Sequence, residues 1–141
     1  MARPAAAAAR LVLLAAVGAC GPTPAAVRVS EPLPSGAPVL VVTAARQKDA
    51  IERALRAVGF AVDDRPRQGD YLLRVTLGVD QGARACGTLN NVRYELRRDG
   101  RTLIEVEAKG WTGTCEPNVF DDASRALQRQ VSESAGKEAS R

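Results

Sequence analysis

The chain has 141 residues, of which 45% are hydrophobic and 26% charged, and its formal net charge is +4. This length fits one small domain and excludes several independently folded ones. Because the sequence contains no histidine, it lacks the commonest general base and metal ligand of enzymes.

The first twenty residues have the pattern of a bacterial export signal. Arg3 and Arg10 precede an apolar run, which small residues follow. The run is about half as long as a membrane-spanning helix, which needs roughly 20 apolar residues. The segment ends in Val17-Gly18-Ala19-Cys20. This ending resembles the lipobox of bacterial lipoproteins, with valine where leucine is most frequent.

The lipobox resemblance implies that residues 1–19 are a signal peptide and that acyl chains anchor Cys20 to a membrane. Stable anchoring needs more than one acyl chain, and lipoproteins of this type usually carry three. The residue after the cysteine is Gly21 and not aspartate. This resembles the pattern of lipoproteins that are sorted to the outer membrane in enteric-type bacteria. The expected location is therefore the cell envelope, at the outer membrane facing the periplasm.

Export also argues against nucleic acid as a partner. Removal of Arg3 and Arg10 with the signal leaves 18 basic against 16 acidic residues, so the mature charge is only +2. The basic character of the whole chain is therefore not a nucleic-acid footprint.

The mature chain is expected to begin with a tether. Residues 20–38 contain five prolines and little apolar periodicity, which predicts an extended segment. In polyproline II geometry about eighteen residues would reach roughly 50 Å. Residues 39–131 form the expected domain, and the polar residues 132–141 are expected to fray.

A buried strand and a helix open the expected domain. Val39–Val42 is a continuous apolar run, typical of a strand buried on both faces. Thr43 is expected to cap the helix, and Gly59 to end it, with Phe60 packed back on Leu55. The apolar stripe of this helix consists of Ile51, Ala54, Leu55 and Val58, and its polar face of Gln47, Lys48, Glu52, Arg53 and Arg56.

Three alternating segments follow, and they predict half-buried strands. Their inward residues are Tyr71, Leu73, Val75, Leu77 and Val79, then Val92, Tyr94 and Leu96, then Ile104, Val106 and Ala108. A three-residue loop over 98–100 is expected to join the last two strands, with Gly100 left-handed. This register sets Tyr94 opposite Ile104. It also sets Arg93 opposite Glu105, which is a favourable cross-strand pair.

With Cys20 acylated, Cys86 and Cys115 remain. An even number of cysteines in an exported chain predicts a disulfide, and the hairpin register brings these two segments near each other. Closing a loop of about 29 residues would stabilise the fold by roughly 3.6 kcal/mol. Two free buried thiols are the alternative.

Asn118 is expected to cap a second helix, with Asp121 and Asp122 in its first turn. Its inward residues are Phe120, Ala123, Leu127 and Val131. The order strand, helix, strand, strand, strand, helix predicts an α+β fold: a mixed, mostly antiparallel sheet of about four strands with both helices on one face. By architecture alone, this loosely resembles the small domains of envelope-assembly accessory lipoproteins.

Two surface features are candidates for recognition. Arg97, Arg98 and Arg101 cluster at the hairpin tip, where guanidinium groups suit phosphates or an acidic partner, and a solvated turn is the alternative. Trp111 falls on the outward face of its strand. It is expected either to anchor a protein interface or to cover the disulfide. Leu89 is expected near Trp111, and Leu72 and Leu103 are expected on the same face.

The indications of catalytic or metal-binding residues are weaker than those of recognition surfaces. Glu105 and Glu107 lie at i and i+2 on one strand, about 7 Å apart, so a carboxylate pair is geometrically possible. A solvated sheet face beside Lys109 is the favoured interpretation. The aspartate pairs 63–64 and 121–122 lack the spacing of a calcium loop. No motif supports a serine–lysine dyad at the candidate lysines, which are Lys48, Lys109 and Lys137.

We therefore predict no catalytic residue, no metal and no cofactor. The expected function is a non-enzymatic binding or assembly accessory, held at the membrane through Cys20 and partnered by another envelope protein. One alternative is a small periplasmic hydrolase or enzyme inhibitor that uses Glu105 and Glu107. The other is a module that binds anionic lipid through the arginine hairpin.

Overall fold

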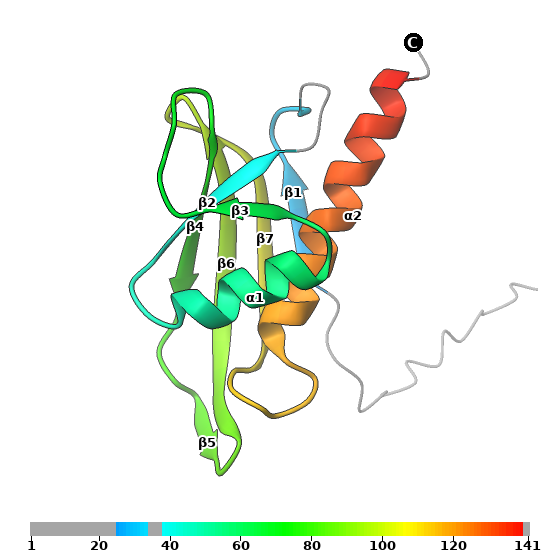
Figure 1. The fold of residues 1–141 in the computed structure, drawn as a ribbon. Coiled ribbons are helices and arrows are strands. Elements are labelled where there is room, and N and C mark those ends of the chain that lie inside the picture. The colour runs from blue at the N-terminus through cyan, green and yellow to red at the C-terminus, as the bar shows by residue number, and fades with distance from the viewer. Residues whose placement is uncertain (1–24, 34–37, 140–141) are drawn as a thin grey trace, which may run out of the picture.

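Two helices cover one face of a seven-stranded mixed sheet in the computed structural model, which describes residues 25–33 and 38–139 (Figure 1). The elements are β1 (Ala26–Val29), β2 (Val39–Ala44), α1 (Lys48–Ala57), β3 (Ala61–Asp63), β4 (Tyr71–Leu77), β5 (Gly82–Arg84), β6 (Gly87–Arg98), β7 (Arg101–Trp111) and α2 (Val119–Ala139). The signal peptide, the lipobox and Cys20 lie outside the described residues.

The strands follow the order β1-β7-β6-β4-β2-β3, and β5 pairs with β6. Strand β2, next to the edge strand β3, is parallel to both of its neighbours, β3 and β4, and the other pairs are antiparallel. The α+β class is confirmed, but the expected number of strands was too low. The missed strands β1, β3 and β5 have only three or four residues each, too few for a visible alternation.

Strand β1 corrects the expected tether. Its four residues pair antiparallel with β7, from Ala26 opposite Glu107 to Val29 opposite Ile104. The folded domain therefore begins by Ala26 and not at residue 39. All four residues are exposed, so no buried face marked this strand in the sequence.

Helix α1 has the predicted apolar face and end. Ile51 and Leu55 are fully buried. Gly59 has a φ of 98°, and the backbone N–H of Phe60 donates to the Leu55 carbonyl at 3.1 Å. This is the hydrogen bond of a glycine-ended helix whose next residue packs back on the last turn.

Two details of α1 differ from the expectation. Thr43 lies within β2, and the cap position belongs to Gln47, which is left-handed and makes no side-chain cap. Glu52 was expected on the polar face but is only 6% exposed. Its carboxylate pairs with Lys48 at 3.7 Å and with Arg56 at 3.5 Å, so charge pairing accompanies its burial.

The hairpin of β6 and β7 also has a different register. Asp99 and Gly100 have φ values of 51° and 76° and form a two-residue turn, not a three-residue loop. A bulge at Leu103 then adds one residue to β7, so Tyr94 faces Val106 and Arg93 faces Glu107. The shift from the expected pairing is two residues. The same side chains therefore still point inward.

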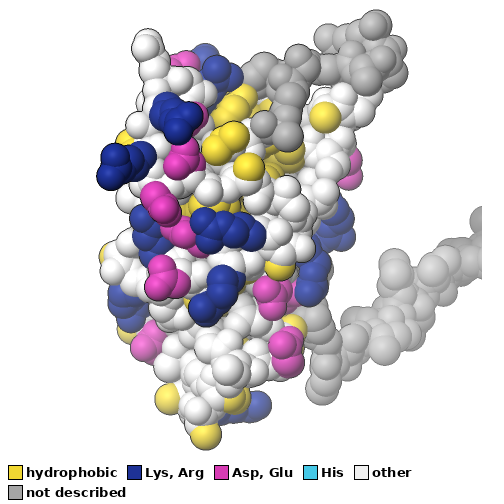
Figure 2. All heavy atoms as spheres, viewed as in Figure 1, with side chains coloured by type: hydrophobic (Ala, Val, Ile, Leu, Met, Phe, Trp, Pro, Cys, Tyr) yellow, Lys and Arg dark blue, Asp and Glu magenta, His cyan; other side chains and the backbone are white. Residues whose placement is uncertain are grey.

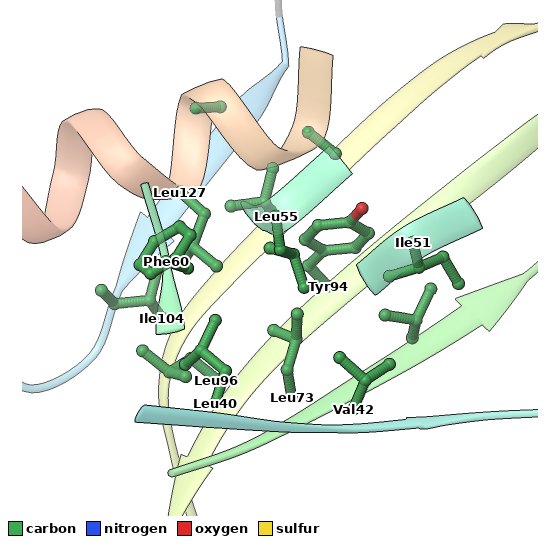
Figure 3. Close-up of a cluster of buried hydrophobic side chains, with 14 of the residues drawn as sticks. Leu40, Val42, Ile51, Leu55, Phe60, Leu73, Tyr94, Leu96, Ile104 and Leu127 are labelled. Atoms are coloured by element: carbon green, nitrogen blue, oxygen red, sulfur yellow. The ribbon is translucent and has the colours of Figure 1, made fainter. Parts of the chain in front are cut away.

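The core lies between the sheet and the two helices. Figure 3 shows side chains from α1, α2, β2, β4, β6 and β7 meeting around Tyr94. The outer side of the helix layer carries interspersed basic and acidic side chains (Figure 2). The face of the sheet opposite the helices has no helix of the described ranges upon it.

Helix α2 is longer than expected. Asn118 caps it as predicted, since its side-chain oxygen accepts the Phe120 backbone N–H at 2.9 Å. The helix continues to Ala139, so residues 132–139 are helical and not frayed. Glutamate, alanine and lysine favour this conformation. Neither helix in the described part of the chain is long and apolar enough to cross a membrane.

Candidate functional site

Cys86 and Cys115 form the predicted disulfide, with their Cα atoms 4.9 Å apart. It joins the turn between β5 and β6 to the segment after β7. The backbone N–H of Thr114 also donates to the Cys86 carbonyl, at 2.7 Å. The bond and the backbone contact together fix the end of the molecule that contains β5.

Trp111 lies at this same end, on the last position of β7. It faces Leu89 across the hairpin, and the guanidinium of Arg84 lies 4.4 Å from the centre of its ring. The expected apolar face is only partly present. Leu72 is 41% exposed, but Leu103 is 4% exposed, because the bulge turns it away from the outward face.

The hairpin arginines have separate partners. Arg97 donates to the Gly100 carbonyl at 3.1 Å, and Arg101 pairs with Glu31 at 3.1 Å. Arg98 donates to the hydroxyl of Tyr71 at 3.0 Å and lies over its ring. Arg97 and Arg98 border a hollow of about 240 Å³, which Arg101 does not line. The structure therefore does not join the three residues into one clamp.

Glu105 and Glu107 share one cation. Arg93 lies 3.2 Å from the Glu105 carboxylate and donates to Glu107 at 2.7 Å. The hydrogen bond to Glu107, followed by the charges of both carboxylates, raises the pKa of Arg93. Acid–base pairs use two carboxyl groups in contrasting environments, whereas these two contact the same guanidinium. This arrangement favours a structural ion-pair network.

A hollow of about 570 Å³ lies on the open face of the sheet. The registers place Thr76, Arg93, Glu107 and Ala26 side by side across β4, β6, β7 and β1. Directly opposite residues point to the same side of a sheet. The neighbours of Arg93 along β6 are buried towards the helices, so this row points away from them.

We call this region the open-face hollow, and its polar lining consists of Thr76, Asn91, Arg93, Glu107 and Lys109. It combines both charges with uncharged hydrogen-bonding groups. Sequence reasoning found Glu107 and Lys109 as exposed strand residues but did not find the hollow. Four strands build it, and one of them was assigned to the tether.

The aspartate pairs have local partners. Asp63 pairs with Arg67 at 3.7 Å and accepts the backbone N–H of Arg65. Burial raises the pKa of Asp122, which also pairs with Arg125 at 3.4 Å. Among the described side chains, no group of three or more Cys, Asp or Glu residues is placed to hold a metal ion.

No protein-family model matches the chain, and no curated protein matches it. Among solved structures, the PelC dodecamer from Paraburkholderia phytofirmans matches with 17% identity and a TM-score of 0.44, covering 79% of this chain and 96% of that one. A minor lipoprotein from Acinetobacter baumannii matches with 20% identity and a TM-score of 0.38, covering 74% and 96%. Likenesses this distant carry no conclusion about function.

Proposed function

We propose that this chain is a lipid-anchored envelope lipoprotein that binds another envelope component without catalysing a reaction. The lipobox-like ending at Cys20 supports the anchor. The pairing of the two other cysteines supports export, since disulfides persist in oxidising compartments. The outer membrane is the proposed location because Gly21 follows the cysteine.

The observation that carries the binding role is the open-face hollow. The helices cover one side of the sheet, and the uncovered side presents Arg93, Glu107 and Lys109 beside Thr76 and Asn91. Such a surface offers donors, acceptors and both charges to a polar partner. Electrostatic complementarity of this kind provides specificity more than affinity.

Metabolic labelling with a palmitate analogue tests the anchor. The wild type is expected to incorporate the label, and Cys20→Ser is expected to lose it. An unlabelled wild type would contradict the anchored function.

Site-specific photocrosslinking in intact cells tests the binding surface. Crosslinkers at Thr76 and Asn91 should both trap the same envelope component, and Lys109→Glu should abolish both products. A crosslinker at Ala57, which is exposed on α1, is the matched control. Equal products from Ala57, or none from the hollow, would overturn the assignment.

A further inference from the structure

The pairing of β1 with β7 limits how far the domain can stand from the lipid anchor. Only residues 21–25 separate Cys20 from Ala26, the first residue of β1. Six Cα-to-Cα steps span at most about 20 Å, whatever the conformation of the chain. The eighteen-residue tether expected from the sequence would have allowed every orientation, but this short connection does not.

The direction of β1 shows which end of the sheet is near the anchor. The strand starts opposite Glu107 and runs towards Ile104, away from Trp111. Trp111 lies on the side of the sheet from which the chain enters β1. It is four residues beyond Glu107 on β7, so it is about 14 Å from the start of β1 along the strand direction. Gly87, opposite Arg84, is two residues further, so the connection can just reach that level. The arginine hairpin lies in the opposite direction.

The end near the anchor has the composition of a bilayer interface. Val79 is 86% exposed, and hydrophobic side chains are visible around the β5 end in Figure 2. Leu89 and Trp111 are half-buried neighbours, and Arg84 lies over the tryptophan ring. Tryptophan and basic side chains prefer the layer where acyl chains meet headgroups, because each has an apolar body and a polar tip.

Acidic groups at this end do not oppose the contact strongly. Asp80 accepts a hydrogen bond from the Asn90 amide at 2.7 Å. Glu116 is exposed beside Cys115, whereas Arg84 and Lys109 supply the positive charge. The surface is therefore near neutral, and its attraction to lipid is mainly apolar and aromatic.

We propose that this end, defined by Val79, Arg84, Leu89 and Trp111, rests on the bilayer that holds Cys20, with Trp111 in the interfacial layer. The proposal depends on the lipid anchor of the proposed function. In this orientation the arginine hairpin points away from the bilayer, and the open-face hollow lies beside it.

Trp111 is the only tryptophan of the chain, so its fluorescence reports one site. The acylated full-length protein is purified from membranes and reconstituted in vesicles whose phospholipids carry bromine near the top of the acyl chains. Brominated vesicles should lower the emission of Trp111 relative to matched unbrominated vesicles. Val79→Asp, at an exposed position that should tolerate charge, should reduce this quenching.

A matched control moves the probe to the other end of the sheet. The double variant Trp111→Phe with Leu72→Trp places the indole opposite Arg97, and bromine should leave its emission unchanged. Loss of palmitate labelling would refute the anchor itself. Labelled protein with unquenched Trp111, or with quenching only in the Leu72→Trp control, would refute this orientation and leave the anchor intact.

Discussion

Tyr94 places a hydroxyl group inside the core. The residue is fully buried, its hydroxyl lies 3.2 Å from Ser124 Oγ, and it donates to the Phe120 carbonyl at 3.4 Å. Both contacts tie β6 to α2. We expect Tyr94→Phe to lower the unfolding free energy by about 1 kcal/mol at neutral pH, as measured by urea denaturation. An unchanged midpoint would mean that the hydroxyl contributes nothing.

Burial raises the pKa of Tyr94 above its ordinary value near 10. Above that pH, the unfolded state loses the phenol proton while the folded state keeps it. Stability is therefore complete below about pH 10 and falls as the pH rises, by up to about 1.4 kcal/mol per unit. The wild type should lose stability more steeply than Tyr94→Phe between pH 10 and 11, because only the wild type has this buried phenol proton to lose on unfolding. Parallel curves would contradict this.

Replacing Gly59 and replacing Gly136 by alanine should have opposite effects on the stability of the protein. At Gly59 the φ of 98° strains any side chain, so Gly59→Ala should cost about 1 kcal/mol. Gly136 lies within α2 with open space for a methyl group. Gly136→Ala should therefore gain about 0.5–1 kcal/mol. Thermal unfolding of both variants tests this, and equal signs would refute the assigned conformations.

At the scale of elements, the disulfide should stabilise the domain strongly. The loop that it closes has a separation of 29 residues, which predicts a loss of about 3–4 kcal/mol in the double variant Cys86→Ser with Cys115→Ser. Denaturation of the oxidised wild type and the double variant, both in non-reducing buffer, measures the difference. A loss below about 1 kcal/mol would contradict this prediction and would mean that the disulfide contributes little to the stability of the domain.

The elements that could be predicted are those with a recognisable pattern in their own residues. The apolar stripe of α1, its end at Gly59 and the alternation of β4, β6 and β7 are local patterns, and the structure has them. The exception is Val79, which was expected to point inward but lies beyond the end of β4 and is 86% exposed. The bulge at Leu103 could not be predicted, because it is specified by contacts between strands. Strand β1 has four exposed residues and no periodicity, so only its pairing with β7 reveals it.

The candidate site divides in the same way. The disulfide followed from the number and position of the cysteines, and the outward direction of Trp111 followed from strand alternation. The open-face hollow depends on the side-by-side arrangement of β4, β6, β7 and β1. The arginines 97, 98 and 101 are close in sequence, yet each finds its own partner. Proximity along a hairpin did not predict convergence of the side chains.

At the scale of the whole molecule, the pairing of β1 with β7 and the proposed anchor together determine how the domain is oriented on the bilayer. In the proposed orientation, the connection of residues 21–25 to β1 holds the domain against the bilayer, with the hollow beside the lipid and the hairpin turned outward. This geometry makes lengthening the connection an informative change. Inserting a flexible segment of about ten Gly and Ser residues after Gly21 adds roughly 16–19 Å of average reach. The insertion should leave palmitate labelling intact but weaken the bromine quenching of Trp111, and unchanged quenching would mean that the surface binds lipid without help from the short connection.

The proposed anchor, location and orientation all depend on the acylation of Cys20. Intact-mass spectrometry of the protein extracted from bacterial membranes tests it directly. We predict a chain that lacks the first nineteen residues and carries the added mass of acyl chains on its N-terminal cysteine. An unmodified chain that retains those nineteen residues would contradict the anchor, the proposed location and the orientation inferred from them.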